Sequence, residues 1–157
     1  MADLPQIVDL RQSPTALRVQ RGVMRFLRAA HDFCCYAEVS LSNGRRADVV
    51  AVGPKGEIWI VEIKSSLEDF RVDTKWPEYR AYCDRLLFAV APAFPMGVLP
   101  VDTGLIVADR FGGEMIRGAP QHALPAARRK ALLIAIARHA CLRLQTALDP
   151  ESAWLDV

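Results

Sequence analysis

The segment DVVAVGPKGEIWIVEIK, residues 48–64, constrains the fold of this chain more than any other stretch. Two β-branched runs flank the Gly-Pro-Lys-Gly sequence at residues 53–56, which is the pattern of two strands joined by a tight turn. Each run is apolar on both of its faces, as expected for strands that are covered on both sides of a sheet. The segment therefore predicts a hairpin inside a layered domain.

Charged side chains interrupt the open end of this hairpin. Because side chains alternate across a strand, Glu62 and Lys64 share one face of the second strand. A hairpin that closes about Lys55 pairs residues whose numbers sum to 110, which places Asp48 directly opposite Glu62. Their Cβ atoms would then lie roughly 4.5–5.5 Å apart.

Two facing carboxylates are unfavourable unless positive charge lies between them, and Lys64 supplies only one such charge. A divalent cation is the natural partner, because magnesium takes oxygen ligands and keeps waters that can attack a phosphate. Lys64 would then orient such a water or stabilise charge on a phosphoryl oxygen. The alternative interpretation is a salt-bridged edge strand.

This arrangement, in which a hairpin joins an acid to a Glu-X-Lys sequence at the end of the second strand, resembles the PD-(D/E)XK nuclease superfamily. A narrower resemblance covers roughly residues 14–145. The segments NGRRADVVAV, IVEIKSS, DFRVDTKWPEYRAYCDRLLFAV and GLIVAD are similar to the MmcB-type bacterial DNA repair family. This resemblance implies a restriction-endonuclease-like fold and a role in DNA repair.

The resemblance also implies roles for individual residues. Asp48 and Glu62 would bind magnesium or manganese, the Ile63 carbonyl would add a ligand, and Lys64 would assist the attacking water. Many superfamily members take a further acid from their first helix, and the helix predicted here over residues 14–30 contains none. Glu38 is the candidate for that third acid.

The position of Glu38 depends on the turn that follows it. A two-residue type I′ turn at Asn43-Gly44 pairs numbers that sum to 87 and points Glu38 away from Asp48. A three-residue loop, Ser42-Asn43-Gly44, with Gly44 in the left-handed conformation, gives a sum of 86 and places Glu38 across from Asp48. We favour the three-residue loop, because it supplies the acid that the first helix lacks.

Basic residues gather toward both ends of the chain, although the net charge is only +2. The first predicted helix carries an arginine stripe at steps of three and four, which is either a solvated face or a surface for phosphate contacts. The stripe consists of Arg18, Arg21, Arg25 and Arg28. Arg45, Arg46 and Lys75 are the other predicted DNA contacts. Positive flanks around an acidic centre suit a polyanionic substrate.

The chain has 157 residues, of which 52% are hydrophobic, and this is sufficient for the core of a single domain. We expect the core to cover about residues 14–147, between a loose N-terminal arm and a C-terminal tail. Apolar runs at residues 86–91 and 104–109 predict buried strands. A helix over residues 125–147 is expected to bury its ALLIAIA centre. The predicted fold class is α/β, a mixed sheet of about four or five strands flanked by helices.

The sequence contains neither a run of eighteen apolar residues nor a signal-peptide pattern, so we expect a cytoplasmic protein without a membrane span. The leading function is a metal-dependent nuclease that acts on DNA in repair, with other repair proteins as further partners. The alternatives are a DNA-binding repair factor with little or no cleavage and a protein-interaction module with an acidic partner. Salt-dependent DNA binding would distinguish the nuclease and the DNA-binding factor from the protein-interaction module. Metal-dependent cleavage would distinguish the nuclease from the DNA-binding factor.

Overall fold

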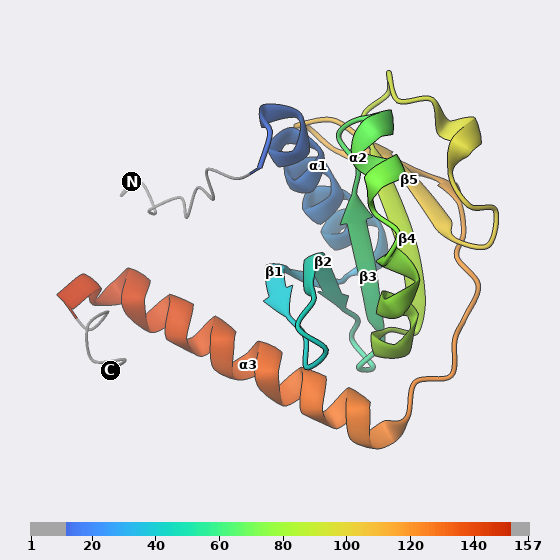
Figure 1. The fold of residues 1–157 in the computed structure, drawn as a ribbon. Coiled ribbons are helices and arrows are strands. Elements are labelled where there is room, and N and C mark those ends of the chain that lie inside the picture. The colour runs from blue at the N-terminus through green and yellow to red at the C-terminus, as the bar shows by residue number, and fades with distance from the viewer. Residues whose placement is uncertain (1–11, 152–157) are drawn as a thin grey trace.

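A computed structural model describes residues 12–151 and contains one mixed sheet with strand order β1-β2-β3-β4-β5-β6 (Figure 1). The predicted α/β class is confirmed, and the sheet has six strands where four or five were expected. In chain order the elements are α1 (Pro14–His31), β1 (Cys34–Ser40), β2 (Arg46–Val52), β3 (Ile58–Ile63), α2 (Leu67–Val72), η1 (Trp76–Tyr82), β4 (Arg85–Val90), η2 (Met96–Val98), β5 (Gly104–Ala108), β6 (Gly113–Arg117) and α3 (Ala126–Leu148).

The strand directions divide the sheet into two parts. Strands β1, β2 and β3 are antiparallel neighbours, whereas β3, β4 and β5 run parallel and β6 returns antiparallel to β5. The carboxyl ends of β3, β4 and β5 therefore meet at one edge of the sheet. This carboxyl edge lies at the upper end of Figure 1, beside α2 and the start of α1.

The β2–β3 hairpin has the predicted register. Val49 pairs with Val61 and Val52 with Ile58, so paired numbers sum to 110. The turn closes with a 3.0 Å hydrogen bond from the Gly56 N–H to the Gly53 carbonyl, and Gly56 takes a positive φ of 86°. A residue without Cβ takes this left-handed conformation at little cost, so local turn chemistry fixes the pairing.

The β1–β2 hairpin has the predicted three-residue loop. Ala37 pairs with Val49 and Ser40 with Arg46, so paired numbers sum to 86. Gly44 has a φ of 81°, as the bulged loop requires. The ladder is interrupted where Glu38 and Asp48 would pair, and Glu38 itself has a positive φ of 60°. The strands are therefore distorted beside Asp48.

Helix α1 covers one face of the sheet. Ser13 caps it by accepting a hydrogen bond from the Ala16 N–H, and Pro14 occupies its first turn, so the helix begins where the sequence predicts. The helix approaches closely at Gly22, where a Cβ atom would lie 1.8 Å from the Asp109 carbonyl oxygen. Glycine is therefore required at this crossing. The core on this face includes Val19, Val23, Leu27, Val49, Ala51, Val61, Leu87 and Ile106.

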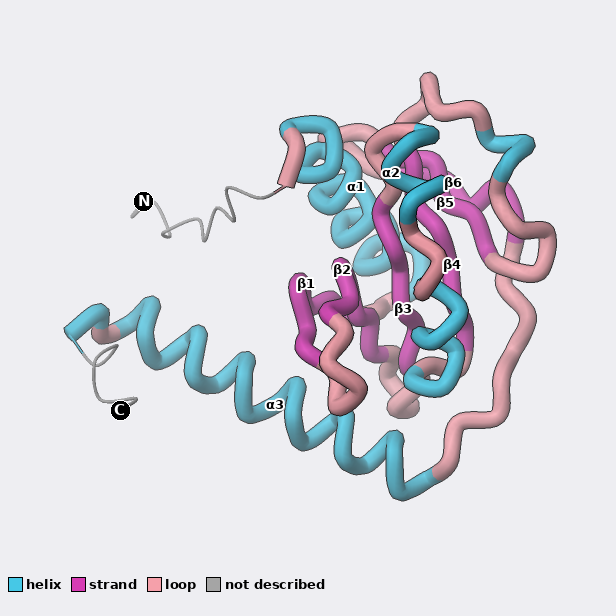
Figure 2. Tube along the Cα trace, in the orientation of Figure 1, coloured by secondary structure: helices cyan, strands magenta, loops and turns pink. Residues whose placement is uncertain are grey.

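The opposite face is covered mainly by η1 and by part of α3 (Figure 2). The segment from Trp76 forms the 3-10 helix η1, and this segment buries Tyr79 and Cys83 against the sheet. Phe70 and Trp76 pack edge-on against the buried Phe88 ring. Both faces of the central strands are thus covered, as their apolar sequences indicated.

Helix α3 differs from the prediction, because most of its apolar centre is not buried. Leu132 is its only buried residue, and Ile134 is 50% exposed. Bidentate contacts of 2.6 and 2.7 Å from Arg129 to Asp84 anchor its first turns, while its C-terminal part extends past β1 (Figure 1). By length and composition alone α3 is apolar enough to cross a membrane, but it carries several arginines.

Candidate active site

Asp48 and Glu62 lie where β2 and β3 separate. The backbone ladder ends at the Val49–Val61 pair, and two side-chain hydrogen bonds replace its continuation. Asp48 Oδ2 accepts a 2.8 Å bond from the Ile63 N–H, and Glu62 Oε1 accepts a 3.2 Å bond from the Asp48 N–H. Each carboxylate is therefore fixed through one oxygen by the opposite strand.

Burial of the two acids opposes their ionisation. Burial raises the pKa of Asp48 to about 6, although the hydrogen bond from the Ile63 N–H acts in the opposite direction. Burial also raises the pKa of Glu62 well above its ordinary value, and the negative charge of Asp48 adds to this effect. Both acids therefore ionise less readily than free carboxyl groups, and a bound cation would favour their ionised forms.

Lys64 follows the two acids at the end of β3 and is only 5% exposed. Its Nζ donates a 2.5 Å hydrogen bond to Asp73 Oδ2, just beyond the C-terminus of α2. Burial tends to lower the pKa of Lys64, but the hydrogen bond and charge of Asp73 raise it overall. The side chain is therefore a charged donor and not a neutral base at ordinary pH.

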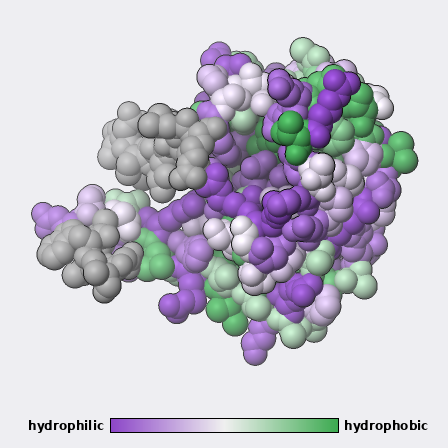
Figure 3. Space-filling model, in the orientation of Figure 1, coloured by the Kyte–Doolittle hydropathy of each residue, from purple (hydrophilic) through white to green (hydrophobic). Residues whose placement is uncertain are grey.

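These groups share one polar hollow of about 330 Å³, which we call the acid hollow. The start of α1 forms one wall of it through Ser13 and Ala16. Figure 3 shows that hydrophilic residues dominate the middle of the face it presents. Of the predicted site residues, the acid hollow brings together Arg46, Asp48, Glu62, Ile63 and Lys64.

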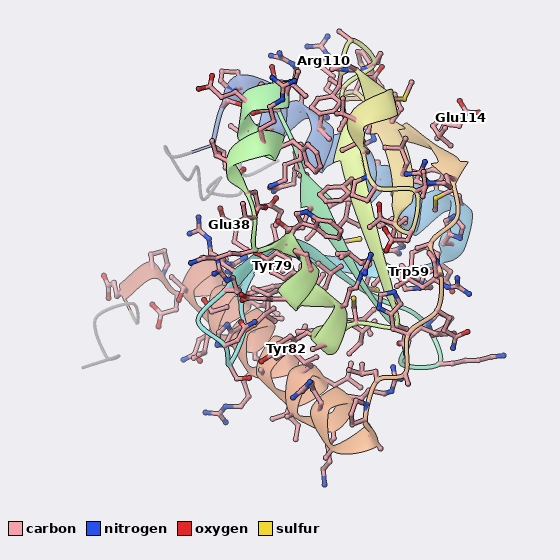
Figure 4. The ribbon with its side chains drawn as sticks, turned by 45° about the vertical axis from the view of Figure 1, so that its right-hand side comes forward. Glu38, Trp59, Tyr79, Tyr82, Arg110 and Glu114 are labelled. Carbon is pink, nitrogen blue, oxygen red and sulfur yellow. The ribbon has the colours of Figure 1, made fainter. Side chains whose placement is uncertain are left out.

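The structure does not bring Glu38, the predicted third acid, into the acid hollow. Glu38 lies across from Asp48 in register, but no cluster of three potential metal-ligating side chains occurs within residues 12–151. The left-handed backbone at Glu38 breaks the alternation of side chains on which the prediction depended. Glu38, labelled in Figure 4, forms an ion pair with Arg46, with an Nη2 to Oε1 distance of 3.8 Å.

The other predicted DNA contacts differ in their surroundings. The four arginines of the α1 stripe are exposed, and none makes an ion pair with another described residue. Arg45 instead pairs with Glu78 at 3.0 Å. Lys75 is exposed but lies outside the acid hollow, and its N–H donates to Asp73.

Two acids that the sequence reasoning missed complete the site. Asp73 holds Lys64, and Asp69 lines the acid hollow while accepting 2.9 and 3.3 Å hydrogen bonds from the N–H and Oγ of Ser65. The sequence signal for them is the presence of three acids, Glu68, Asp69 and Asp73, within the nine residues that follow Lys64. A short capped helix there folds back upon the lysine.

Comparison with known proteins agrees with this fold. The family model described as DNA repair protein MmcB-like matches residues 3–151. A solved structure of a protein of unknown function from Silicibacter pomeroyi is 46% identical, with a TM-score of 0.83, and the match covers 92% of this chain and 96% of that one. No curated protein matches. The chain therefore belongs to the MmcB-like DNA repair protein family.

Proposed function

We propose that this protein is a metal-dependent nuclease of the PD-(D/E)XK type that hydrolyses DNA phosphodiester bonds during repair. The observation that carries the proposal is the pairing of the partly buried Asp48 carboxylate with the buried Glu62 carboxylate, beside a buried, charged Lys64 in one polar hollow. Membership of a DNA repair family supports DNA as the substrate class.

The donor set fits a hard divalent cation. Asp48 and Glu62 each use one oxygen for a backbone hydrogen bond, which leaves Asp48 Oδ1 and Glu62 Oε2 as available oxygen ligands. The Ile63 carbonyl is the third proposed ligand. Magnesium or manganese bound by these oxygens would supply an activated water and charge stabilisation at the phosphate.

Lys64 contributes positive charge at the reacting phosphate. Because Asp73 keeps the ammonium charged and oriented, Lys64 is suited to donate a hydrogen bond to the attacking water or to a phosphoryl oxygen. Asp73 does not line the acid hollow, so we assign it the role of a positioning residue. The ion pair fixes the lysine before substrate arrives.

The exposed arginine stripe of α1 is the proposed contact for the DNA backbone. Arg18, Arg21 and Arg25 lie on the helix whose first turn borders the acid hollow, so phosphates bound along α1 would lead to the carboxylates. Such contacts position a strand without reading its sequence. Arg46 adds positive charge at the acid hollow itself.

A second candidate function is DNA binding without cleavage. The specific observation in its favour is that Glu38, the predicted third acid, does not line the acid hollow, and that no cluster of three potential metal-ligating side chains occurs within residues 12–151. A protein of this kind would bind DNA through the same arginine stripe and recruit other repair proteins.

A cleavage assay separates these candidates. Wild-type protein is incubated with single-stranded, duplex, flap and junction DNA in magnesium or manganese, with Asp48→Asn as the matched variant. The asparagine retains an oxygen for the Ile63 N–H, so the hairpin contact persists. We expect cleavage by the wild type alone and none in EDTA. Salt-sensitive binding by both proteins without cleavage would favour the second candidate.

A further inference from the structure

Three hollows follow one another along the carboxyl edge of the sheet. The acid hollow shares Ser65 with a middle hollow of about 440 Å³, which lies at the ends of β3, β4 and β5. The middle hollow shares Pro92, Ala108 and Asp109 with an outer hollow of about 390 Å³, beside the turn into β6. Ligands of open α/β sheets bind outside the carboxyl ends of strands, where these hollows lie.

The middle hollow has apolar walls and a basic rim. Val19, Phe94 and Pro95 contribute to the walls, and the side chains of Arg18 and Thr15 lie at the α1 side. Its volume is within the range of small-molecule sites, which are mostly apolar with a few polar groups. A nucleobase with its sugar has the size and the mixed polarity that this hollow fits.

The outer hollow ends in an exposed aromatic ring. Phe111 is 65% exposed, and the guanidinium carbon of Arg110 lies 4.6 Å from the centre of its ring. Asp109 Oδ1 accepts hydrogen bonds from the Phe111 and Gly112 N–H groups, which fixes the turn that presents the ring. Figure 4 shows Arg110 at the same upper end of the molecule as α2 and the start of α1.

We infer that the three hollows form a track for single-stranded DNA that runs from Asp48 and Glu62 to Phe111. Bases would enter the apolar middle hollow and stack on Phe111, while Arg18 and Arg110 contact phosphates. A continuous duplex keeps its bases stacked inside and cannot offer them to a concave surface, whereas proteins bind single strands through aromatic stacking and basic grooves. The inference deepens the proposed function, on which the assignment of the acid end rests.

The test is the affinity of short, labelled oligothymidylate for Phe111→Ala, measured by fluorescence anisotropy in EDTA. Val101→Ala is the matched control, because Val101 is 84% exposed and precedes β5, at the opposite edge of the sheet. We expect Phe111→Ala to bind about tenfold more weakly than the wild type, the size expected for one lost base–aromatic stack. Val101→Ala and Phe111→Trp should bind as tightly as the wild type.

The middle hollow has its own variant. Ala93 is exposed at this hollow, so Ala93→Glu should weaken oligothymidylate binding by adding a negative charge. The control is Ala123→Glu, which adds the same charge at an exposed position before α3 and should leave binding unchanged. An oligomer of abasic sugar-phosphates should bind more weakly than oligothymidylate and should not distinguish Phe111→Ala from the wild type. Equal binding of oligothymidylate by Phe111→Ala and Val101→Ala would overturn the track.

The track and the nuclease proposal fail in different ways. Base-dependent binding in EDTA without cleavage in any metal would overturn the nuclease and leave the track. Cleavage by the wild type, with oligothymidylate binding unaffected in Phe111→Ala and Ala93→Glu, would overturn the track and leave the nuclease. Tighter binding of duplex than of single-stranded DNA by the wild type would also contradict the track.

Discussion

Lys64 and Asp73 form a largely buried ion pair, with 2.5 Å between Nζ and Oδ2, although they lie nine positions apart in the chain. The intervening helix α2 returns the acid to the lysine. The pair keeps the Lys64 ammonium at the end of β3 charged, close to the buried Glu62. The structure thus maintains a positive charge where two carboxylates oppose each other.

Replacing Asp73 by asparagine should leave Lys64 buried without its charged partner. We expect the free energy of unfolding, measured by urea denaturation near neutral pH, to fall by about 1–3 kcal/mol. The Lys64 pKa is raised in the fold, so its stabilisation is complete at neutral pH and is lost only as the pH rises through that raised value. Glu68→Gln, at an exposed position of α2, is the control. Equal losses in both variants would refute the role of the pair.

Glu62→Gln should stabilise the protein in alkaline solution. The fold raises the pKa of Glu62 well above its ordinary value of 4.5. The stability that protonated Glu62 contributes is therefore complete when the pH is below 4.5, and it is lost as the pH rises through the folded-state pKa. Glutamine does not ionise and keeps an oxygen for the Asp48 N–H. Urea denaturation at about pH 8 should show a larger free energy of unfolding for Glu62→Gln than for the wild type. A variant that is less stable than the wild type at about pH 8 would contradict this assignment.

The α1 stripe should determine the salt dependence of DNA binding. Replacing Arg21 and Arg25 together by glutamine should lower the slope of log affinity against log salt concentration by about two. Lys130 and Arg138 are exposed on α3, away from the stripe, and their double replacement by glutamine is the matched control. If the slope of the α1 variant equals that of the wild type, the stripe is a solvated face.

Gly22→Ala tests the packing of α1 on the sheet. The added Cβ would lie 1.8 Å from a backbone oxygen, so the helix must move, and we expect a loss of about 2 kcal/mol or more. Gly112→Ala has no atom within 4 Å of its new Cβ and serves as the control. Thermal denaturation should rank Gly22→Ala well below Gly112→Ala. Indistinguishable melting temperatures would contradict the close approach at Gly22.

Local signals were sufficient for the hairpins and for α1. Gly44 and Gly56 both take left-handed backbone angles in their turns. The turn residues therefore predict both turn types, and the turn types set the register of each hairpin, including the positions of Asp48 and Glu62. The start of α1 is also a local signal, because Ser13 is the N-cap and Pro14 is the first helical residue.

Contacts between distant segments were harder to predict. The ALLIAIA sequence of α3 indicated burial, but an apolar helix does not reveal whether a neighbour covers it, and Ile134 is half exposed. The role of Asp73 depends on the fold of α2, and the position of Glu38 depends on one left-handed residue inside a strand. These features follow from packing and strand distortion and not from side-chain alternation.

The central claim is that Asp48 and Glu62 jointly bind one divalent cation. Isothermal titration calorimetry with manganese tests it most directly, using the wild type, Glu62→Ala and, as a control outside the acid hollow, Glu38→Ala. Because the pKa of Asp48 is raised to about 6, binding should release protons and weaken as the pH falls through that value. We predict one bound manganese ion for the wild type and Glu38→Ala, and none for Glu62→Ala. Equal manganese binding by all three proteins, or none by the wild type at neutral pH, would contradict the claim.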